Sequence, residues 1–265
     1  MVVALDRVAE RVRALADRYR PPTFEHVPDP DAALFLCAVD HRTGYRARYL
    51  VGGRGPFEGS ALMWELGLRA ARRERGLLTA ARLVDVSAGR VAEIFRIGGE
   101  TVADQERRAA LWRDLARGLA DRYSGSAAAL LAFCERRLGG GSGLIARLQE
   151  FEAYGDPLAK KAFLFAKIAA RRGWLQVDDP GCWEVCADNV LMRLALRSGL
   201  VEPGPLEVVR AATRVAFKEV AEAAGISPPV LDDLLWERGR EDPGLLGAAA
   251  GELEEPPRDP ASHWY

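Results

Sequence analysis

The sequence predicts an all-α fold that is mostly helical and includes at most one short pair of strands. The main observation is that apolar residues recur at helical spacing through most of the chain from Ser60 onward. These periodic segments end at helix-terminating glycines, among them Gly98, Gly173 and Gly199. Bulk composition agrees, because 49% hydrophobic and 28% charged residues are typical of a globular chain, and 265 residues bury a substantial core.

Two segments precede the helical region. Residues 3–19 carry apolar positions at helical spacing and form the first expected helix, which Pro21 and Pro22 end. The apolar run 34–39 is too short for its periodicity to separate a strand from a buried helix, and a glycine-rich loop follows at 52–56. Further helices are expected at residues 60–75, 79–84, 87–96, 104–122, 126–138, 143–153, 157–172, 189–198, 205–224 and 228–238.

The charge balance limits the classes of partner. With 37 basic and 38 acidic residues the formal net charge is −1, so the chain lacks the broad positive field that holds duplex DNA non-specifically. No run approaches the length of a membrane span, and the charged, amphipathic N-terminus is not typical of a signal peptide. We therefore expect a cytoplasmic protein with a small-molecule partner and no membrane partner; DNA is the alternative partner.

The cysteines favour a reducing compartment. Cys37, Cys134, Cys182 and Cys186 are too few and too scattered for a disulfide scaffold in a chain of this length. Cys182 and Cys186 are separated by three residues and have no histidine nearby, which is a poor ligand set for zinc. We expect neither a metal ion nor another cofactor.

Lysine is rare in the chain, and its placement is informative. Four of the 37 basic residues are lysine, and Lys160, Lys161 and Lys167 lie within eight residues of the expected helix 157–172. The neighbours from 162 to 170 are almost all apolar, which predicts a largely buried helix. A lysine there has its pKa lowered unless an anion meets it. Chance clustering on a solvated face is the alternative interpretation.

Asp188 is the strongest candidate among the carboxylates. It directly precedes the expected helix 189–198 and follows the apolar approach 183–187. An aspartate at this position is an N-cap, whose side chain is rigidly aimed. It can be a plain cap or can also lie at the inner mouth of a cleft, and the two interpretations are compatible.

Other polar and aromatic residues are candidates for ligand contact. Asp40 and His41 follow an apolar run beside a turn, where a polar pair can face a ligand; a capping aspartate and a surface histidine are the alternative. Aromatic rings stack on purine-like bases, although each ring alone is more often part of a core. The aromatic candidates are Trp236, Phe35, Trp183 and Trp64.

The order of a lysine-bearing helix, a linker of about twenty residues and an Asp-capped helix resembles helix-hairpin-helix base-excision glycosylases. Residues 161–166, Asp188 and 231–236 resemble the archaeal 8-oxoguanine DNA glycosylase family. A longer resemblance, collinear over residues 34–238, is to the queuosine salvage proteins, which hydrolyse queuosine 5′-phosphate. It runs through residues 35–37, 61–73, 91–96, 106–108, 123–126, 160–162, 187–188, 207–210 and 235–236.

These resemblances imply a helix-hairpin-helix DNA-glycosylase-like architecture. We expect a single domain of two interlocked subdomains over residues 1–246, followed by a flexible, Pro- and Glu-rich tail at 247–265. The chain departs from both families at particular positions. Asn189 and Val190 stand where the salvage proteins have an aromatic and a basic residue, and Gly155 is the only glycine of the hairpin before the lysine.

The chemistry that both families share is cleavage of an N-glycosidic bond. The resemblance implies that Asp188 stabilises the oxocarbenium charge on the sugar or activates water. The DNA enzymes implicate Lys161 as a Schiff-base nucleophile, and the salvage proteins implicate Lys160 as a phosphate ligand. We add Lys167 as a substrate contact and expect Lys160 or Lys161 within reach of Asp188.

The near-zero net charge favours a modified nucleoside or its 5′-phosphate, of the queuosine type, as substrate over duplex DNA. Two other functions compete with this one. The first is a DNA glycosylase/lyase that excises an oxidised purine, 8-oxoguanine, and the second is a nucleotide-binding module without catalysis.

Overall fold

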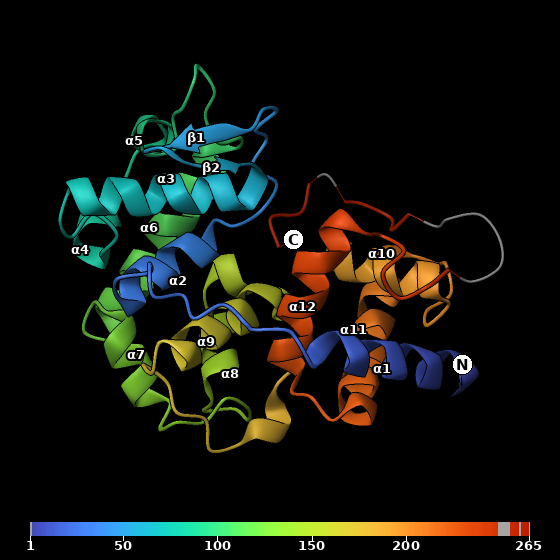
Figure 1. Ribbon diagram of the computed structural model, residues 1–265. Helices are drawn as coiled ribbons and strands as arrows, with labels where there is room; N and C mark the ends of the chain where they lie inside the picture. Colours follow the sequence, from blue (N-terminus) through green and yellow to red (C-terminus); the bar gives the residue numbers. More distant parts are fainter. Residues whose placement is uncertain (1, 249–254, 260, 265) are drawn as a thin grey trace. The chain divides into compact units, whose positions relative to one another are not determined.

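A computed structural model describes residues 2–248, 255–259 and 261–264, and Figure 1 shows its helices and strands. The chain forms two compact units. The terminal unit comprises Met1–Thr23 and Pro180–Ser262, and the central unit comprises Phe24–Asp179 and His263–Tyr265. About 55% of the residues are helical and the described residues form one two-stranded sheet, which confirms the all-α class with a short strand pair.

The central unit is built around one largely buried helix, α2 (Pro30–Ala38). Every residue from Ala32 to Ala38 is buried, since α2 packs against α3, α6, α7 and α9. The apolar run 34–39, for which the sequence left strand and buried helix open, therefore forms the second half of α2 and its C-cap. This part of the helix is apolar on all sides. The other elements of this unit are β1 (Tyr49–Val51), β2 (Arg54–Phe57), α3 (Gly59–Arg73), α4 (Ala80–Leu83), α5 (Ala88–Ile94), α6 (Gln105–Arg122), α7 (Ala127–Phe133), α8 (Leu144–Gln149), η1 (Glu152–Tyr154) and α9 (Lys160–Arg171).

The glycine-rich loop forms a β-hairpin. Strands β1 and β2 pair antiparallel, with Tyr49 opposite Phe57. Gly52 and Gly53 at the tip have φ angles of +60° and +79°, a backbone region that favours glycine. The hairpin contacts α3, where the buried carboxylate of Glu65 forms ion pairs with arginines.

The terminal unit is a small helical bundle of α1 (Val2–Ala16), η2 (Pro180–Cys182), α10 (Asn189–Ser198), α11 (Leu206–Ala224) and α12 (Pro228–Glu241). Helix α1 packs on α11, and α10 packs on both α11 and α12. The facing side chains include Val12, Met192, Phe217 and Leu235, all buried. The burial of these faces follows from the helical spacing of apolar residues in each segment.

Several helices are shorter than the sequence predicts. The helix expected at 126–138 ends at Phe133, because Glu135 and Arg136 adopt φ angles of +47° and +65° that a helix does not allow. The helix expected at 157–172 begins at Lys160, not Pro157. The Asp156 carboxylate stabilises the start of this helix, since it accepts hydrogen bonds from the backbone N–H groups of Leu158 (3.1 Å) and Lys160 (3.0 Å).

The helix-hairpin-helix architecture, the single domain over residues 1–246 and the flexible tail at 247–265 stay predictions. Residues 249–254, 260 and 265 of that tail lie outside the described residues. Of the described part, Glu255 forms ion pairs with Arg193 (3.3 Å) and Arg197. No helix in the described ranges has both the length and the apolar character that a bilayer crossing requires.

Candidate functional site

Lys161 is fully buried in the central unit, as its apolar surroundings predict. Its side chain has no exposed surface, and its Nζ donates a hydrogen bond to the carbonyl oxygen of Ala38 at 2.6 Å. The same Nζ lies 3.3 Å from His41 Nδ1. Burial, and next the charge of Lys160, hold the pKa of the Lys161 amine well below its usual range. A lysine of this kind is an anion ligand or, as the neutral amine, a nucleophile.

Arg108 of α6 is the second fully buried cation, and it meets Lys161 at His41. Its Nη1 lies 3.2 Å and 3.1 Å from the two ring nitrogens of His41, and its Nη2 donates to the His41 carbonyl oxygen at 2.6 Å. Further donors reach the carbonyl oxygens of Ala103 (2.8 Å) and Val39. Burial lowers the pKa of Arg108 to about 10.

His41 is buried and neutral, so the predicted surface position for it is excluded. Burial, followed by the charges of Lys161 and Arg108, holds its pKa far below the usual range. The neighbouring Asp40 is also buried and accepts hydrogen bonds from Ser60 Oγ (2.9 Å) and Trp64 Nε1 (3.0 Å). The polar pair predicted from the sequence therefore faces inward in the central unit.

Asp40, His41, Arg108 and Lys161 together form what we call the Lys161 cluster. Asp40 is the carboxylate that acts on both cations, raising the pKa of each. In the described part of the chain neither Lys161 nor Arg108 forms an ion pair. Both donate instead to carbonyl oxygens at and after the end of α2, which carry only partial negative charge. The cluster thus places two basic side chains beside one carboxylate, an arrangement that an anionic ligand complements.

His263, near the C-terminus, adds a further side chain next to His41 of this cluster. Its ring lies edge-on to His41 at a centroid distance of 6.2 Å. Arg107 Nη2 lies 3.1 Å from Nδ1, and the carbonyl oxygen of Glu152 lies 3.1 Å from Nε2. Because arginine only donates and a carbonyl only accepts, these contacts require the neutral tautomer protonated at Nε2. Burial is the main reason that the pKa of His263 is lowered.

Sequence reasoning assigned no role to Arg108 or His263. Arg108 was visible only as part of the segment 106–108 that resembles the salvage proteins, and His263 only as one of three histidines in the chain. Neither lies near Lys161 in sequence. Their position is a product of long-range packing.

The remaining candidates of the central unit have other surroundings. Lys160 is partly exposed and Lys167 is buried. Phe35 has no exposed surface and belongs to the core of α2, where its carbonyl oxygen accepts a hydrogen bond from Trp112 Nε1 at 2.6 Å. The predicted ligand contacts of these three residues stay predictions.

Asp188 is an N-cap in the terminal unit, as predicted. One carboxylate oxygen, Oδ1, accepts hydrogen bonds from the backbone N–H groups of Val190 (2.9 Å) and Leu191 (3.1 Å). The chain on its N-terminal side is held by two buried side chains, Asp232 and Arg210, which the sequence analysis included only within the resembling segments 231–236 and 207–210. Asp232 Oδ1 accepts from the Cys186 N–H at 2.7 Å.

Arg210 is the other buried side chain on this segment. It is 1% exposed, and its Nε lies 3.4 Å from the carbonyl oxygen of Ala187. Helices α11 and α12 therefore both anchor the backbone immediately before Asp188. This anchoring leaves the carboxylate little freedom, which suits a group that must meet developing charge at a fixed position.

Trp236 is a partly buried residue of α12 that packs against the core of the terminal unit, with the Arg240 guanidinium 4.7 Å from its ring centroid. Its stacking role stays a prediction. Asp188 belongs to the terminal unit and Lys160 and Lys161 to the central unit. The expected proximity of a lysine to Asp188 likewise stays a prediction.

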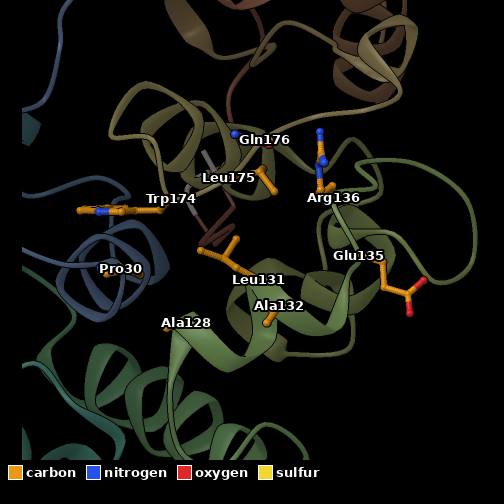
Figure 2. A pocket seen from close by; sticks show the side chains of 9 residues that line it. All are labelled: Pro30, Ala128, Leu131, Ala132, Glu135, Arg136, Trp174, Leu175 and Gln176. Atoms are coloured by element: carbon orange, nitrogen blue, oxygen red, sulfur yellow. The ribbon is translucent and has the colours of Figure 1, made fainter.

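A separate pocket of about 490 Å³ lies in the central unit (Figure 2). Its walls are mostly apolar and come from the start of α2, from α7 and the residues that follow it, and from the segment after α9. Figure 2 shows the side chain of Glu135 directed away from Leu131, and none of the predicted site residues lines the pocket. The lining residues are Pro30, Ala128, Leu131, Ala132, Glu135, Arg136, Trp174, Leu175 and Gln176.

Among the described residues no group of three or more His, Cys, Asp or Glu side chains is placed to hold a metal ion. Cys182 is exposed and Cys186 is buried. No protein-family model and no curated protein matches the sequence.

Proposed function

We propose that the protein is an N-glycosidase that hydrolyses the N-glycosidic bond of a modified nucleoside or nucleoside 5′-phosphate of the queuosine type. The observation that carries the proposal is the Lys161 cluster, in which two buried cations are hydrogen-bonded to carbonyl oxygens and form no ion pair within the described residues. A phosphate group is an anion that such a cluster fits. The fixed carboxylate of Asp188 supports the same reaction.

The proposed reaction uses Asp188 at the sugar. As the bond between C1′ and the base nitrogen breaks, its electron pair leaves with the base and positive charge develops on the sugar ring. The Asp188 carboxylate stabilises this charge or takes a proton from the attacking water, whose oxygen bonds to C1′. The proton that the attacking water loses is the one that the departing base nitrogen gains, so the free base and the hydroxylated sugar are the products.

Lys161 and Arg108 act as phosphate ligands in this proposal. The pKa of Lys161 is lowered chiefly by burial, and an anion beside the amine reverses that effect and favours the ammonium form. Arg108 keeps its charge, because its pKa of about 10 is still well above neutral pH. Phosphate binding and an ammonium at Lys161 therefore support each other.

One observation favours a second function, that of a DNA glycosylase/lyase for an oxidised purine such as 8-oxoguanine. A lysine whose pKa is lowered supplies the neutral amine that forms a Schiff base with the sugar. One observation weighs against it: the net charge of the chain is −1, which gives duplex DNA no broad positive surface to bind. A non-catalytic nucleotide-binding module is the remaining alternative.

The test is a screen of nucleosides, nucleoside 5′-phosphates and lesion-containing DNA for release of free base, with the native chain and Asp188→Asn. The amide still caps α10 but does not offset a cation, so the variant should melt as the native protein does and lose about a hundredfold or more in rate. Near-normal base release by Asp188→Asn would remove Asp188 from the mechanism. Binding of a nucleotide without any base release would favour the binding module.

A further inference from the structure

His263 contacts the Lys161 cluster through the ring of His41. The two rings lie edge-on with 6.2 Å between their centroids, a separation at which aromatic rings are in contact. His41 in turn contacts Lys161, with 3.3 Å between His41 Nδ1 and Lys161 Nζ. Lys161, His41 and His263 therefore form a continuous series of contacts within the central unit.

Solvent exposure rises along this series. Lys161 has no exposed surface, His41 is 3% exposed, and His263 is partly exposed. A partly exposed ring in contact with a buried ring excludes water from the surface that it touches. The His263 ring therefore covers part of His41, and His41 covers part of the Lys161 amine.

The contacts that hold His263 in this position are polar. Arg107 Nη2 lies 3.1 Å from its Nδ1, and the carbonyl oxygen of Glu152 lies 3.1 Å from its Nε2. The Arg107 side chain is 43% exposed and also forms an ion pair with the Glu152 carboxylate at 2.8 Å. Because water can replace hydrogen bonds near the surface, displacing the His263 ring costs little free energy compared with unfolding the chain.

His41 is held more firmly than His263. The buried Arg108 donates to the His41 carbonyl oxygen at 2.6 Å, and its Nη1 lies 3.2 Å and 3.1 Å from the two ring nitrogens. In a closely packed interior the His41 ring turns only into space that a neighbour has left. The space that the His263 ring occupies is next to it, so displacement of His263 makes movement of His41 possible.

An anion that binds Lys161 has to reach an amine without exposed surface, so part of the surroundings has to open. We propose that His263 is a lid on the Lys161 cluster, held closed by Arg107 and the Glu152 carbonyl oxygen, and that its displacement admits the anion to Lys161. The identity of that anion, a phosphate group, rests on the proposed function. The closure itself rests on the contacts and burial of the three side chains.

The lid determines how fast Lys161 reacts with a small reagent that modifies amines. Formaldehyde with a borane reductant methylates neutral amines, and mass spectrometry measures the rate at each of the four lysines. The lowered pKa of Lys161 favours its neutral form, so slow methylation in the native chain reports closure and not protonation. We expect His263→Gly to speed methylation of Lys161 by about tenfold or more, and Arg107→Leu to speed it by a smaller factor.

Two controls separate opening of the lid from a loss of fold stability. His26→Gly makes the same substitution at an exposed histidine of the central unit, whose ring neighbour is Phe24, and should leave the Lys161 rate unchanged. Lys167 lies on the same helix as Lys161 and is 4% exposed, so its methylation reports opening of the packing around α9. Its rate should stay the same in all variants.

Inorganic phosphate separates the lid from the proposed function. If the cluster binds phosphate, adding it at constant ionic strength should slow methylation of Lys161 in His263→Gly, because the bound anion covers the amine and favours its ammonium form. If phosphate gives no protection while His263→Gly still speeds methylation, the phosphate role of the proposed function fails and the lid stands.

Three outcomes would overturn the lid. The first is native Lys161 that is methylated as fast as Lys218, whose side chain is partly exposed, because the amine would then not be covered. The second is an unchanged Lys161 rate in His263→Gly, which would show that His263 does not control access. The third is equal acceleration of Lys161 and Lys167, which would assign the effect to general opening of the fold.

Discussion

At the scale of single residues, Lys161 has a role that depends on its protonation. Burial lowers its pKa, and Lys160 lowers it further. We expect the Lys161 amine to titrate well below 10.5, the ordinary pKa of a lysine side chain. Side-chain NMR suits the measurement, because the chain has four lysines.

Lys160→Gln should raise the midpoint of the Lys161 titration, because it removes a neighbouring like charge. Inorganic phosphate should raise the Lys161 midpoint as well if the cluster binds anions. A Lys161 midpoint at or above 10.5 would contradict the lowered pKa.

His41 links stability to pH. Its pKa is lowered in the folded chain, so below the unfolded-state value of 6.5 the unfolded chain binds a proton that the folded chain does not. The stabilisation is therefore fully present above pH 6.5 and is lost as pH falls below it, by up to about 1.4 kcal/mol per pH unit. Urea unfolding at pH 7.5, 6.5 and 5.5 should show a smaller decline for His41→Asn than for the native chain.

The other two histidines are also expected to lower the stability of the folded chain as pH falls. His26 and His263 also have lowered pKa values, chiefly through burial. His263→Asn is therefore a control that should remove a smaller part of the acid decline, because the His41 shift is the largest of the three. An acid decline that His41→Asn leaves unaltered would exclude His41 as its source.

At the scale of elements, α11 and α12 position the capping carboxylate of α10. Asp232 accepts the Cys186 N–H, and Arg210 reaches the Ala187 carbonyl oxygen, so both act on the backbone before Asp188. Asp232→Leu removes the acceptor and should lower kcat by about tenfold or more with little change in KM, since misplacement of a reacting group mainly affects the transition state.

A conservative variant distinguishes a positioning role of Asp232 from a general loss of fold stability. Asp232→Asn keeps an acceptor oxygen and should retain most of the activity that Asp232→Leu loses. In the Asp188→Asn background, Asp232→Leu should lower kcat little further, because the effects of mutations in residues that act as one unit are not additive. Additive losses in that double variant would contradict a role through Asp188.

At the scale of the whole molecule, charge is the property that separates the rival substrates. The net charge is −1, and many arginines have local carboxylate partners, such as Arg48 with Glu58 at 2.6 Å and Arg136 with Asp178 at 2.6 Å. We expect weak duplex binding that falls steeply with salt. Borohydride should trap no covalent complex on lesion DNA, because a hydrolase forms no imine.

The matched control for trapping is Lys161→Gln. Efficient trapping on lesion DNA at physiological salt, lost in Lys161→Gln, would support the DNA glycosylase/lyase and overturn the nucleotide hydrolase. Trapping that persists in Lys161→Gln would point to another amine of the chain.

The sequence by itself determined the helical class, the burial of Lys161 and the capping role of Asp188. These features are local: the spacing of apolar residues predicts a helix and its buried face, and a carboxylate before a helix predicts a cap. Helix ends were less accurate. The turn before Lys160 depends on Ala159 at a φ angle of +52°, a conformation that alanine does not signal in sequence.

Tertiary structure decided which residues meet. His41 and Lys161 are 120 positions apart in the chain and Arg108 is 67 positions from His41, yet all three share one buried cluster. The contact depends on α2, α6 and α9 packing together, and apolar periodicity specifies that a face is buried but not what it is buried against. The contact of His263 with His41 became visible only in the fold for the same reason, because the ring that covers a buried side chain can come from a distant part of the chain.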